Sequence, residues 1–290
     1  MTLIPGKAVT RTIGMVDIRI LSPAKVRAFR KTVNDYFLAN ARCMPWRETR
    51  NPYRILVSEI MLQQTQVERV SVKYEAFVGM FPDFRALADT PLRDVLAAWQ
   101  GLGYNRRARA LRDIARAVTQ EYGGILPDNP DILRTLPGIG HATAGAITAF
   151  SFNKPVVFIE TNIRTVYIHH FFHDETGIPD RRIMPLVRQT IDTSNPRRWY
   201  YALMDYGVML KKNHGNPGRK SIHYSRQSPF RGSDREIRGA VIRELTSSHT
   251  MMETGLIGRL SCSSGRAQAI IASLIREGLI ADKDGSLFIV

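Results

Sequence analysis

Helical periodicity continues almost without interruption from residue 22 to residue 210, and this pattern limits what the chain can fold into. Short separators rich in proline, glycine and asparagine divide the helices. Ser22 and Pro23 are typical of an N-cap and a first helical position. Helices are expected over residues 22–40, 53–67, 70–80, 83–89, 92–99, 106–122, 128–136, 141–152, 162–172, 181–191 and 196–210. No alternating strand pattern occurs before residue 280, so the main body is predicted to be all-α.

The two ends of the chain have a different character. Residues 1–21 carry little pattern and are expected to form a poorly ordered arm. Residues 211–233 contain six basic residues and no acid, which predicts a basic loop and domain linker. Residues 234–290 predict three helices and then a strand, an Asp-Gly turn and a strand, the order of a winged helix-turn-helix. A generic small α+β cap is the alternative, and the polar residues of the third helix, Arg266, Gln268, Ser273 and Arg276, suit DNA without proving it.

Charge restricts the class of partner. The sequence has 41 basic and 26 acidic residues, a formal net charge of +15, and this excess favours a polyanion through counterion release. A membrane surface is the other acidic partner, but no apolar run approaches the roughly 20 residues of a spanning helix, and no signal peptide opens the chain. We therefore expect no membrane association and a cytoplasmic, nucleoid-associated location.

Cysteine usage limits the cofactors. The two cysteines, Cys43 and Cys262, lie far apart and belong to no metal-binding motif. They cannot form a disulfide framework, a zinc site or a four-thiolate cluster. The sequence therefore predicts a reducing compartment and no metal site.

The segment from Leu136 to Gly140 predicts a phosphate site. Its Pro-Gly-Ile-Gly turn joins two helices, and such a turn directs backbone N–H groups and a helix N-terminus outward. About twenty residues later Glu160 follows an otherwise apolar stretch. A phosphate clamp and a nearby acid in a basic protein indicate chemistry on DNA, whereas an ordinary helix-turn-helix corner is the alternative.

A second acid, Glu59, lies among apolar residues on an expected helix. Burial there would raise the pKa of its carboxyl group and keep it protonated as a general acid, unless it is an ordinary surface glutamate. Gln63 and Gln64 follow one turn later. Neutral amides of this length can fill the space left by an extruded base and hydrogen-bond its partner.

The third motif is the Gly-Leu-Gly-Tyr turn and the arginines behind it. Gly103 allows a close approach of the backbone, Tyr104 offers an aromatic wedge, and Arg106 can contact a phosphate. A C-capped helix followed by a solvated basic helix would explain the same residues.

Together these motifs resemble the helix-hairpin-helix DNA glycosylase superfamily that includes endonuclease III, and above all its adenine glycosylase branch. The resemblance covers about residues 24–210. The strings that carry it are Pro-Trp-Arg, Ser-Glu-Ile-Met-Leu-Gln-Gln-Thr-Gln-Val, Gly-Leu-Gly-Tyr, Leu-Pro-Gly-Ile-Gly and Ala-Leu-Met-Asp-Tyr-Gly. It implies a helix-hairpin-helix glycosylase domain over residues 22–210, followed by the linker over 211–233 and the winged helix over 234–290.

The resemblance also implies residue roles. Glu59 would be the general acid, and Glu160 and Asn162 would occupy the position of the catalytic acid and its neighbour. The adenine pocket would be lined by Trp46, Arg47, Leu62 and Asp205. DNA contacts are expected from Gln63, Gln64, Tyr104, Arg106, Gly138, Gly140, Thr143, Lys211, Lys212 and Arg219, with Gln64 as the intercalating wedge. In the family the hairpin often holds a monovalent cation on its carbonyl groups.

Several positions depart from the family. Glu160 replaces an aspartate and is one methylene longer. Ala142 stands where bifunctional relatives keep a Schiff-base lysine, so no β-lyase activity is expected. Residues 211–233 stand where most relatives bind an iron–sulfur cluster through four cysteines, and they contain none, so no cluster is expected.

The sequence thus predicts a monomeric, monofunctional DNA glycosylase that acts on duplex DNA with mismatched or damaged bases. It would flip out and hydrolyse a mispaired base, foremost adenine opposite 8-oxoguanine or guanine. A glycosylase for thymine, uracil or another mismatch is one alternative. A catalytically weak lesion-binding or DNA-binding protein is the other.

Overall fold

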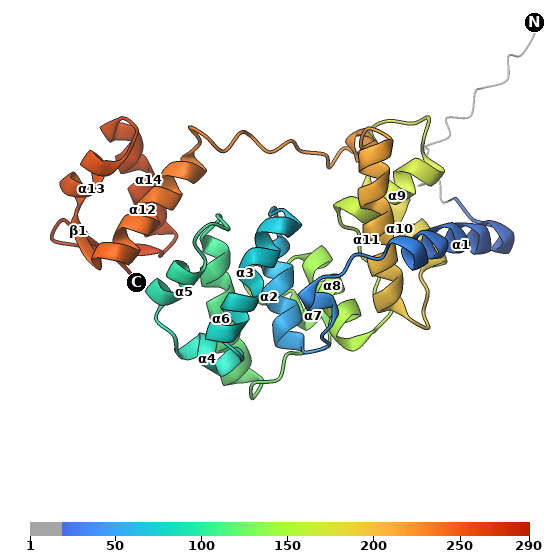
Figure 1. The fold of residues 1–290 in the computed structure, drawn as a ribbon, viewed down its shortest axis with the longest axis horizontal. Coiled ribbons are helices and arrows are strands. Elements are labelled where there is room, and N and C mark those ends of the chain that lie inside the picture. The colour runs from blue at the N-terminus through green and yellow to red at the C-terminus, as the bar shows by residue number, and fades with distance from the viewer. Residues whose placement is uncertain (1–18) are drawn as a thin grey trace, which may run out of the picture. The chain divides into compact units, whose positions relative to one another are not determined.

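The computed structural model describes residues 19–290, and most of its regular elements are helices (Figure 1). The arm predicted over residues 1–21 lies outside the described residues as far as residue 18. The helices occur where the periodicity predicts them, which confirms an all-α body. Within residues 19–290, no helix is both long enough and apolar enough to cross a membrane. The contacts of the chain divide it into two units.

The first unit holds residues 19–40, 159–191 and 201–224. Its elements are α1 (Pro23–Asn40), α9 (Thr161–Phe171), α10 (Asp180–Thr190), the larger part of α11 (Pro196–Asn213) and the short 3-10 helix η2 (Pro217–Lys220). The Ser22 hydroxyl accepts a hydrogen bond from the Lys25 N–H at 3.3 Å, which confirms the predicted N-cap of α1. Phe29 of α1 packs against Tyr167 and Phe171 of α9, with ring centroids 5.4 and 5.2 Å apart.

The first part of the predicted basic loop is ordered within this unit. Helix α11 continues to Asn213, and η2 follows after a short turn. Gly218 is buried so close to α9 that a Cβ atom on it would lie 2.7 Å from the Thr165 hydroxyl oxygen. Ser221 then forms a β-bridge with Ile178. Protein packing therefore fixes this segment where the charge pattern alone predicts a loop.

The second unit holds residues 41–158, 192–200 and 225–290. Its helical part consists of η1 (Pro45–Arg47), α2 (Pro52–Leu62), α3 (Val67–Met80), α4 (Phe84–Asp89), α5 (Leu92–Ala98), α6 (Arg106–Glu121), α7 (Pro130–Leu133) and α8 (His141–Phe152). The interior is rich in aromatic residues, and Tyr74, Phe77 and Trp99 are almost completely buried. The helix predicted over residues 53–67 ends at Leu62, because Gln64 adopts a left-handed backbone conformation, with φ of +54°.

The C-terminal part of the second unit consists of α12 (Asp234–Ser248), β1 (Thr250–Met252), α13 (Glu253–Arg259), α14 (Ser264–Arg276), β2 (Ile280–Lys283) and β3 (Ser286–Ile289) (Figure 1). The strands form an antiparallel sheet in the order β1-β3-β2. Asp284 and Gly285 both have positive φ, as a tight hairpin turn requires, so the predicted hairpin is present. Strand β1 was not predicted, because three residues are too few to show an alternating pattern.

Helix α12 packs against the helical part of the same unit. The Gln100 amide, just beyond α5, donates to the Thr246 hydroxyl of α12 at 2.9 Å. Buried residues of α12, α14 and the sheet belong to the same hydrophobic cluster as those of α2 to α8. The C-terminal elements therefore share a core with the helices that carry the hairpin.

Candidate nucleic-acid interface

The predicted phosphate hairpin forms the turn between α7 and α8. Gly138 has a φ of +75°, and a Cβ atom there would lie 3.2 Å from that of Ala110. Gly140 is the N-cap of α8, and no side chain caps that helix. A Cβ atom on Gly140 would meet nothing within 4 Å. The first N–H groups of α8 are therefore open to an anion, as the sequence predicts for a phosphate site.

Gln63 joins this hairpin to the end of α2. Its amide nitrogen donates to the Gly138 carbonyl at 3.1 Å and to the Thr143 hydroxyl at 3.2 Å. Three residues that the sequence predicts as DNA contacts thus form one hydrogen-bonded group. Because the Gly138 oxygen accepts an amide hydrogen, one of its lone pairs is already used, which weakens the case for a cation there.

Arg107, which no sequence motif singles out, holds the surrounding backbone together. One guanidinium nitrogen donates to the carbonyls of Ile60, Met61 and Gln63 at 2.6 to 2.9 Å. The other donates to the Thr65 hydroxyl and to the carbonyls of Leu102 and Gly103 at 3.0 to 3.1 Å. Burial lowers the pKa of Arg107 to about 10, so the side chain remains charged at neutral pH.

A periodic signal could have identified Arg107. It lies on the same face of α6 as Leu111, Ile114 and Val118, all of which are buried. An arginine at such a position must satisfy its donors inside the protein, whereas Arg106 next to it is exposed. The sequence favours Arg106 as a DNA contact because its charge suits a phosphate.

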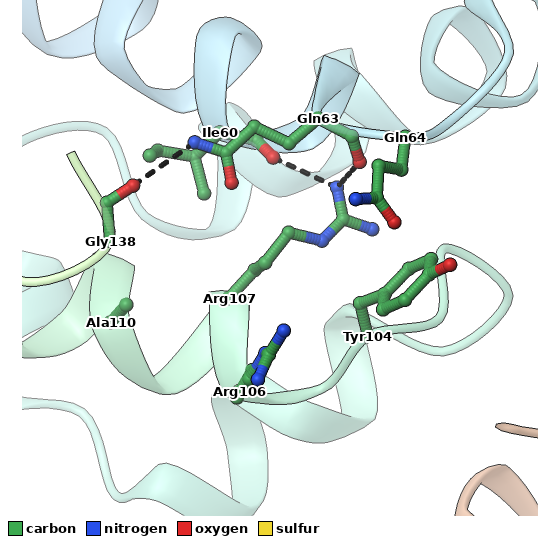
Figure 2. A pocket seen from close by; sticks show the side chains of 8 residues that line it. All are labelled: Ile60, Gln63, Gln64, Tyr104, Arg106, Arg107, Ala110 and Gly138. Atoms are coloured by element: carbon green, nitrogen blue, oxygen red, sulfur yellow. Dashed lines mark hydrogen bonds between the residues drawn. The ribbon is translucent and has the colours of Figure 1, made fainter. Parts of the chain in front are cut away.

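A cavity of about 350 Å³ lies where these segments meet (Figure 2). It is lined by Ile60, Gln63, Gln64, Tyr104, Arg106, Arg107, Ala110 and Gly138. Five of these eight are among the ten predicted DNA contacts, so the structure brings half of that prediction to one place. Figure 2 shows the Arg107 guanidinium beneath the end of α2, with the Gln64 side chain and the Tyr104 ring nearby.

Two residues at this cavity have strained backbones. Gln64 and Tyr104 have φ values of +54° and +50°, a region that residues other than glycine seldom adopt. Such strain costs about 1–3 kcal/mol and persists only where the surroundings enforce it, which occurs frequently at functional sites. Gln64 is also exposed, as expected for a residue that inserts into a ligand.

The predicted acid Glu59 lies on α2, one turn before Gln63. It is half-buried between the buried residues Ser58 and Ile60. Leu62, at the end of the same helix, is also half-buried. Glu59 thus lies between the two alternatives that the sequence leaves open, a buried acid and an ordinary surface glutamate, and both side chains are partly exposed.

The Pro-Trp-Arg motif forms η1. Trp46 is 4% exposed and packs edge-to-face on Tyr74, with ring centroids 5.4 Å apart. The Arg47 guanidinium donates to the Arg42 carbonyl at 3.1 Å, and the Arg47 carbonyl accepts from Arg197 at 2.9 Å. Both predicted pocket residues are thus fixed by packing and hydrogen bonds.

The remaining predicted catalytic residues lie in the first unit. Glu160 is the N-cap of α9, and one carboxylate oxygen accepts from the backbone N–H groups of Asn162 and Ile163 at 2.7 and 2.8 Å. The other oxygen accepts from the Asn162 side-chain amide at 3.2 Å. The longer side chain of a glutamate therefore folds back onto its own helix.

Lys211 completes this group. Its ammonium donates to the Asn162 side-chain oxygen at 2.6 Å, whereas the sequence predicts a DNA phosphate as its partner. Burial lowers the pKa of Lys211, and the charge of Glu160 opposes that shift. Lys212 and Arg219, the other two predicted phosphate ligands of the segment, are exposed. Asp205, predicted in the adenine pocket, is 2% exposed on α11.

The residues in place of the family's cluster loop do not fit an iron–sulfur cluster. No cysteine occurs in residues 211–233, and the two cysteines of the chain lie elsewhere. Within residues 19–290, no group of three or more His, Cys, Asp or Glu side chains could hold a metal ion. Lys211 and Gly218 instead anchor this segment to α9 through the contacts described above.

Comparison with known proteins supports the same family. Residues 57–189 match the model of the HhH-GPD superfamily base excision DNA repair proteins. The adenine DNA glycosylase of Mycolicibacterium smegmatis is 32% identical over 82% of this chain and 88% of its own length. That of Buchnera aphidicola subsp. Baizongia pistaciae is 36% identical over 63% of this chain. Many of the curated relatives are longer, and the chain spans about half of their length or less.

A solved structure extends the likeness to the fold. A thermostable thymine-DNA glycosylase superposes with a TM-score of 0.60 and 26% identity, covering 67% of this chain and 91% of that one.

Proposed function

We propose that the chain, which belongs to the HhH-GPD superfamily of base excision DNA repair proteins, is a monofunctional DNA N-glycosylase that removes adenine mispaired with 8-oxoguanine or guanine. One observation carries the proposal: Gln63, Gln64, Tyr104 and Gly138 line a single cavity beside an open helix N-terminus. A backbone clamp, a wedge and an amide pair are the parts that base extrusion requires. The adenine DNA glycosylases among its relatives favour adenine as the base.

Extrusion would use the strained residues. Gln64 is exposed and held in a left-handed conformation, so its amide can enter the duplex with little further loss of backbone freedom. The N–H groups at the start of α8, together with Gly138 and Gly140, would hold a phosphate of the same strand. The exposed side chains of Lys212 and Arg219 would bind further phosphates.

We assign bond cleavage to two carboxyl groups with different roles. Glu59 would donate a proton to a ring nitrogen of the adenine and so improve the leaving group. Glu160, held by two backbone N–H groups and the Asn162 amide, would stabilise the positive charge that develops on the deoxyribose. Water would then complete the hydrolysis, and Ala142 supplies no amine for strand cleavage. The protein would act as a monomer on cytoplasmic, nucleoid-associated DNA.

A panel of labelled duplexes tests this proposal. The duplexes carry A opposite 8-oxoguanine, A opposite G, T opposite G or U opposite G, and abasic sites are detected as alkali-labile strand breaks. We expect breaks at the two adenine mispairs and a loss of at least about 100-fold in single-turnover rate for Glu59→Gln. Glu75→Gln is the matched control, because Glu75 is an exposed glutamate on α3.

The panel also separates the other candidates. The likeness to a thymine-DNA glycosylase favours thymine opposite guanine as the second candidate substrate. Cleavage of that duplex alone would replace adenine by thymine in the proposal. Tight binding without an abasic product on any duplex would leave only a DNA-binding role.

A further inference from the structure

A second cavity, of about 260 Å³, lies on the other side of Tyr104. It is lined by Gly103, Tyr104, Asn105 and Arg106 and, from the C-terminal helices, by Arg235, Arg238, Gly239 and Glu277. All eight residues belong to the second unit. The proposed cleavage of the base uses none of the C-terminal residues.

Charge at this cavity is unevenly neutralised. Arg238 forms an ion pair with Glu277 at 2.5 Å and contacts the Ser273 hydroxyl at 3.2 Å. Arg106 and Arg235, by contrast, form no ion pair with any described residue. Two positive charges therefore remain uncompensated around one small cavity, and an anion would neutralise them.

Arg235 is also held in a fixed orientation. One guanidinium nitrogen donates to the Tyr104 hydroxyl at 3.2 Å, and the other donates to the Ser228 carbonyl at 2.5 Å. Both acceptors are neutral, so they position the guanidinium without cancelling its charge. A planar guanidinium with a fixed orientation is well suited to a phosphate group.

Tyr104 connects the two cavities. It lines both of them, and the guanidinium groups of Arg107 and Arg235 lie 5.4 and 5.6 Å from the centroid of its ring. Its hydroxyl also accepts a hydrogen bond from the Gln227 amide. Figure 2 shows Tyr104 and Arg106 together at the edge of the first cavity. A ligand in the second cavity would thus lie next to the aromatic wedge.

Helix α14, the element that the sequence offers as a recognition helix, uses part of its polar face internally. Arg266 pairs with Asp234 at 2.6 Å, and Ser273 donates to Glu277 at 3.1 Å. The uncompensated charge of the C-terminal part at this cavity lies instead on the first turn of α12. Among the C-terminal helices, α12 therefore supplies the unpaired positive charge at this cavity.

We propose that the second cavity binds a phosphate of the DNA backbone, with Arg106 and Arg235 as its ligands. Through Arg235, the C-terminal part of the chain contributes to the DNA surface beside Tyr104 without reading base edges. The identification of the ligand as duplex DNA rests on the proposed function. Binding of this kind is independent of sequence and depends on salt, because each neutralised phosphate releases about one counterion.

The test measures binding of the full-length chain to an undamaged duplex, on which no base is removed. For Arg106→Gln and for Arg235→Gln, we expect affinity to fall roughly tenfold at low salt and the slope of log K against log salt to decrease by about one. Arg243→Gln is the matched control, since Arg243 is an exposed arginine on the same helix that does not line the cavity. It should change the affinity by less than about twofold.

A space-filling variant tests the cavity without removing any charge. A Cβ atom on Gly239 would meet nothing within 4 Å, so Gly239→Leu should fold normally and fill the cavity. We expect weaker binding to undamaged duplex, whereas Gly255→Leu, at an exposed and equally open helical glycine, should bind like the wild type.

The outcomes separate this inference from the proposed function. If Arg235→Gln and Gly239→Leu both bind like their controls while the wild type still excises adenine, the phosphate site is refuted and the glycosylase function stands. If the wild type excises no base but the two variants lose affinity and salt dependence as expected, the phosphate site stands and the function is refuted.

Discussion

Replacing Arg107 by methionine should weaken both the fold and the DNA surface. Arg107 is 7% exposed, and the change keeps an unbranched side chain of similar length but removes a guanidinium that donates to six acceptors. Three of those acceptors are carbonyls of the buried residues Ile60, Met61 and Leu102. The other three acceptors belong to half-buried residues and can accept hydrogen bonds from water instead.

The expected loss of stability follows from the three buried carbonyl groups that would lose their hydrogen-bond donor. A buried polar group that loses its partner costs about 1–3 kcal/mol, and the removal of a buried charge offsets part of the total. We expect the free energy of unfolding to fall by about 3 kcal/mol for Arg107→Met. A lysine has a single terminal nitrogen and cannot reach both sets of acceptors, so Arg107→Lys should lower the free energy of unfolding by about half as much.

Urea unfolding followed by circular dichroism measures this loss, and 2-aminopurine fluorescence in a mispaired duplex measures base extrusion under conditions where the variant is folded. We expect extrusion to be impaired in Arg107→Met, because the guanidinium fixes the backbones that carry Gln64 and Tyr104. An unfolding free energy within about 1 kcal/mol of the wild type, together with normal extrusion, would refute this reasoning.

Two further predictions concern the first unit. Burial lowers the pKa of His170 to about 4, and its ring packs on Phe29 and bonds to the Tyr206 hydroxyl. The unfolded state therefore takes up the proton first, so His170 stabilises the fold fully above about pH 6.5 and less as the pH falls toward 4. Unfolding at several pH values should show an acid-side loss of about 1–2 kcal/mol that His170→Phe removes, and an unchanged pH profile would contradict the assignment. Gly207→Ala would place a Cβ atom 2.5 Å from the Asn162 carbonyl oxygen, so we expect a loss of about 1–3 kcal/mol in thermal unfolding and slower excision. A wild-type melting temperature would contradict this expectation.

The helices could be predicted because their apolar residues recur at the helical period and their ends carry proline, glycine and asparagine. The predicted helix and loop boundaries were wrong where a single backbone angle or a tertiary contact determines the local structure. The helix predicted over residues 53–67 ends at Leu62, before Gln64, whose left-handed backbone is not a local preference of glutamine. The segment after Leu210 is ordered because Gly218 fits against Thr165, and no local pattern contains that information.

The site was predictable wherever a motif combines a turn with a chemical group. Gln63, Gly138 and Thr143 were each selected separately, and their hydrogen bonds to one another follow only from the packing of α2 against α8. Arg235 was out of reach for a different reason. Arg235 was singled out because it forms no ion pair with a carboxylate. The sequence does not show which charged side chains lie close together in the fold, so an unpaired charge cannot be recognised from it.

Glu160, which the resemblance places where the family has an aspartate, keeps its carboxylate close to the start of α9. An aspartate at an N-cap reaches the N–H groups of its helix directly. The glutamate has one more methylene and reaches the same kind of groups by folding back, with one oxygen on two N–H groups and the other on the Asn162 amide. The extra length is therefore taken up within the cap, which limits how far the negative charge moves. Lys211 then holds the Asn162 oxygen, so that the amide presents its N–H to the carboxylate. A side-chain hydrogen-bond network thus holds the Glu160 carboxylate in place, and its lysine comes from the segment that the sequence predicts as a basic loop.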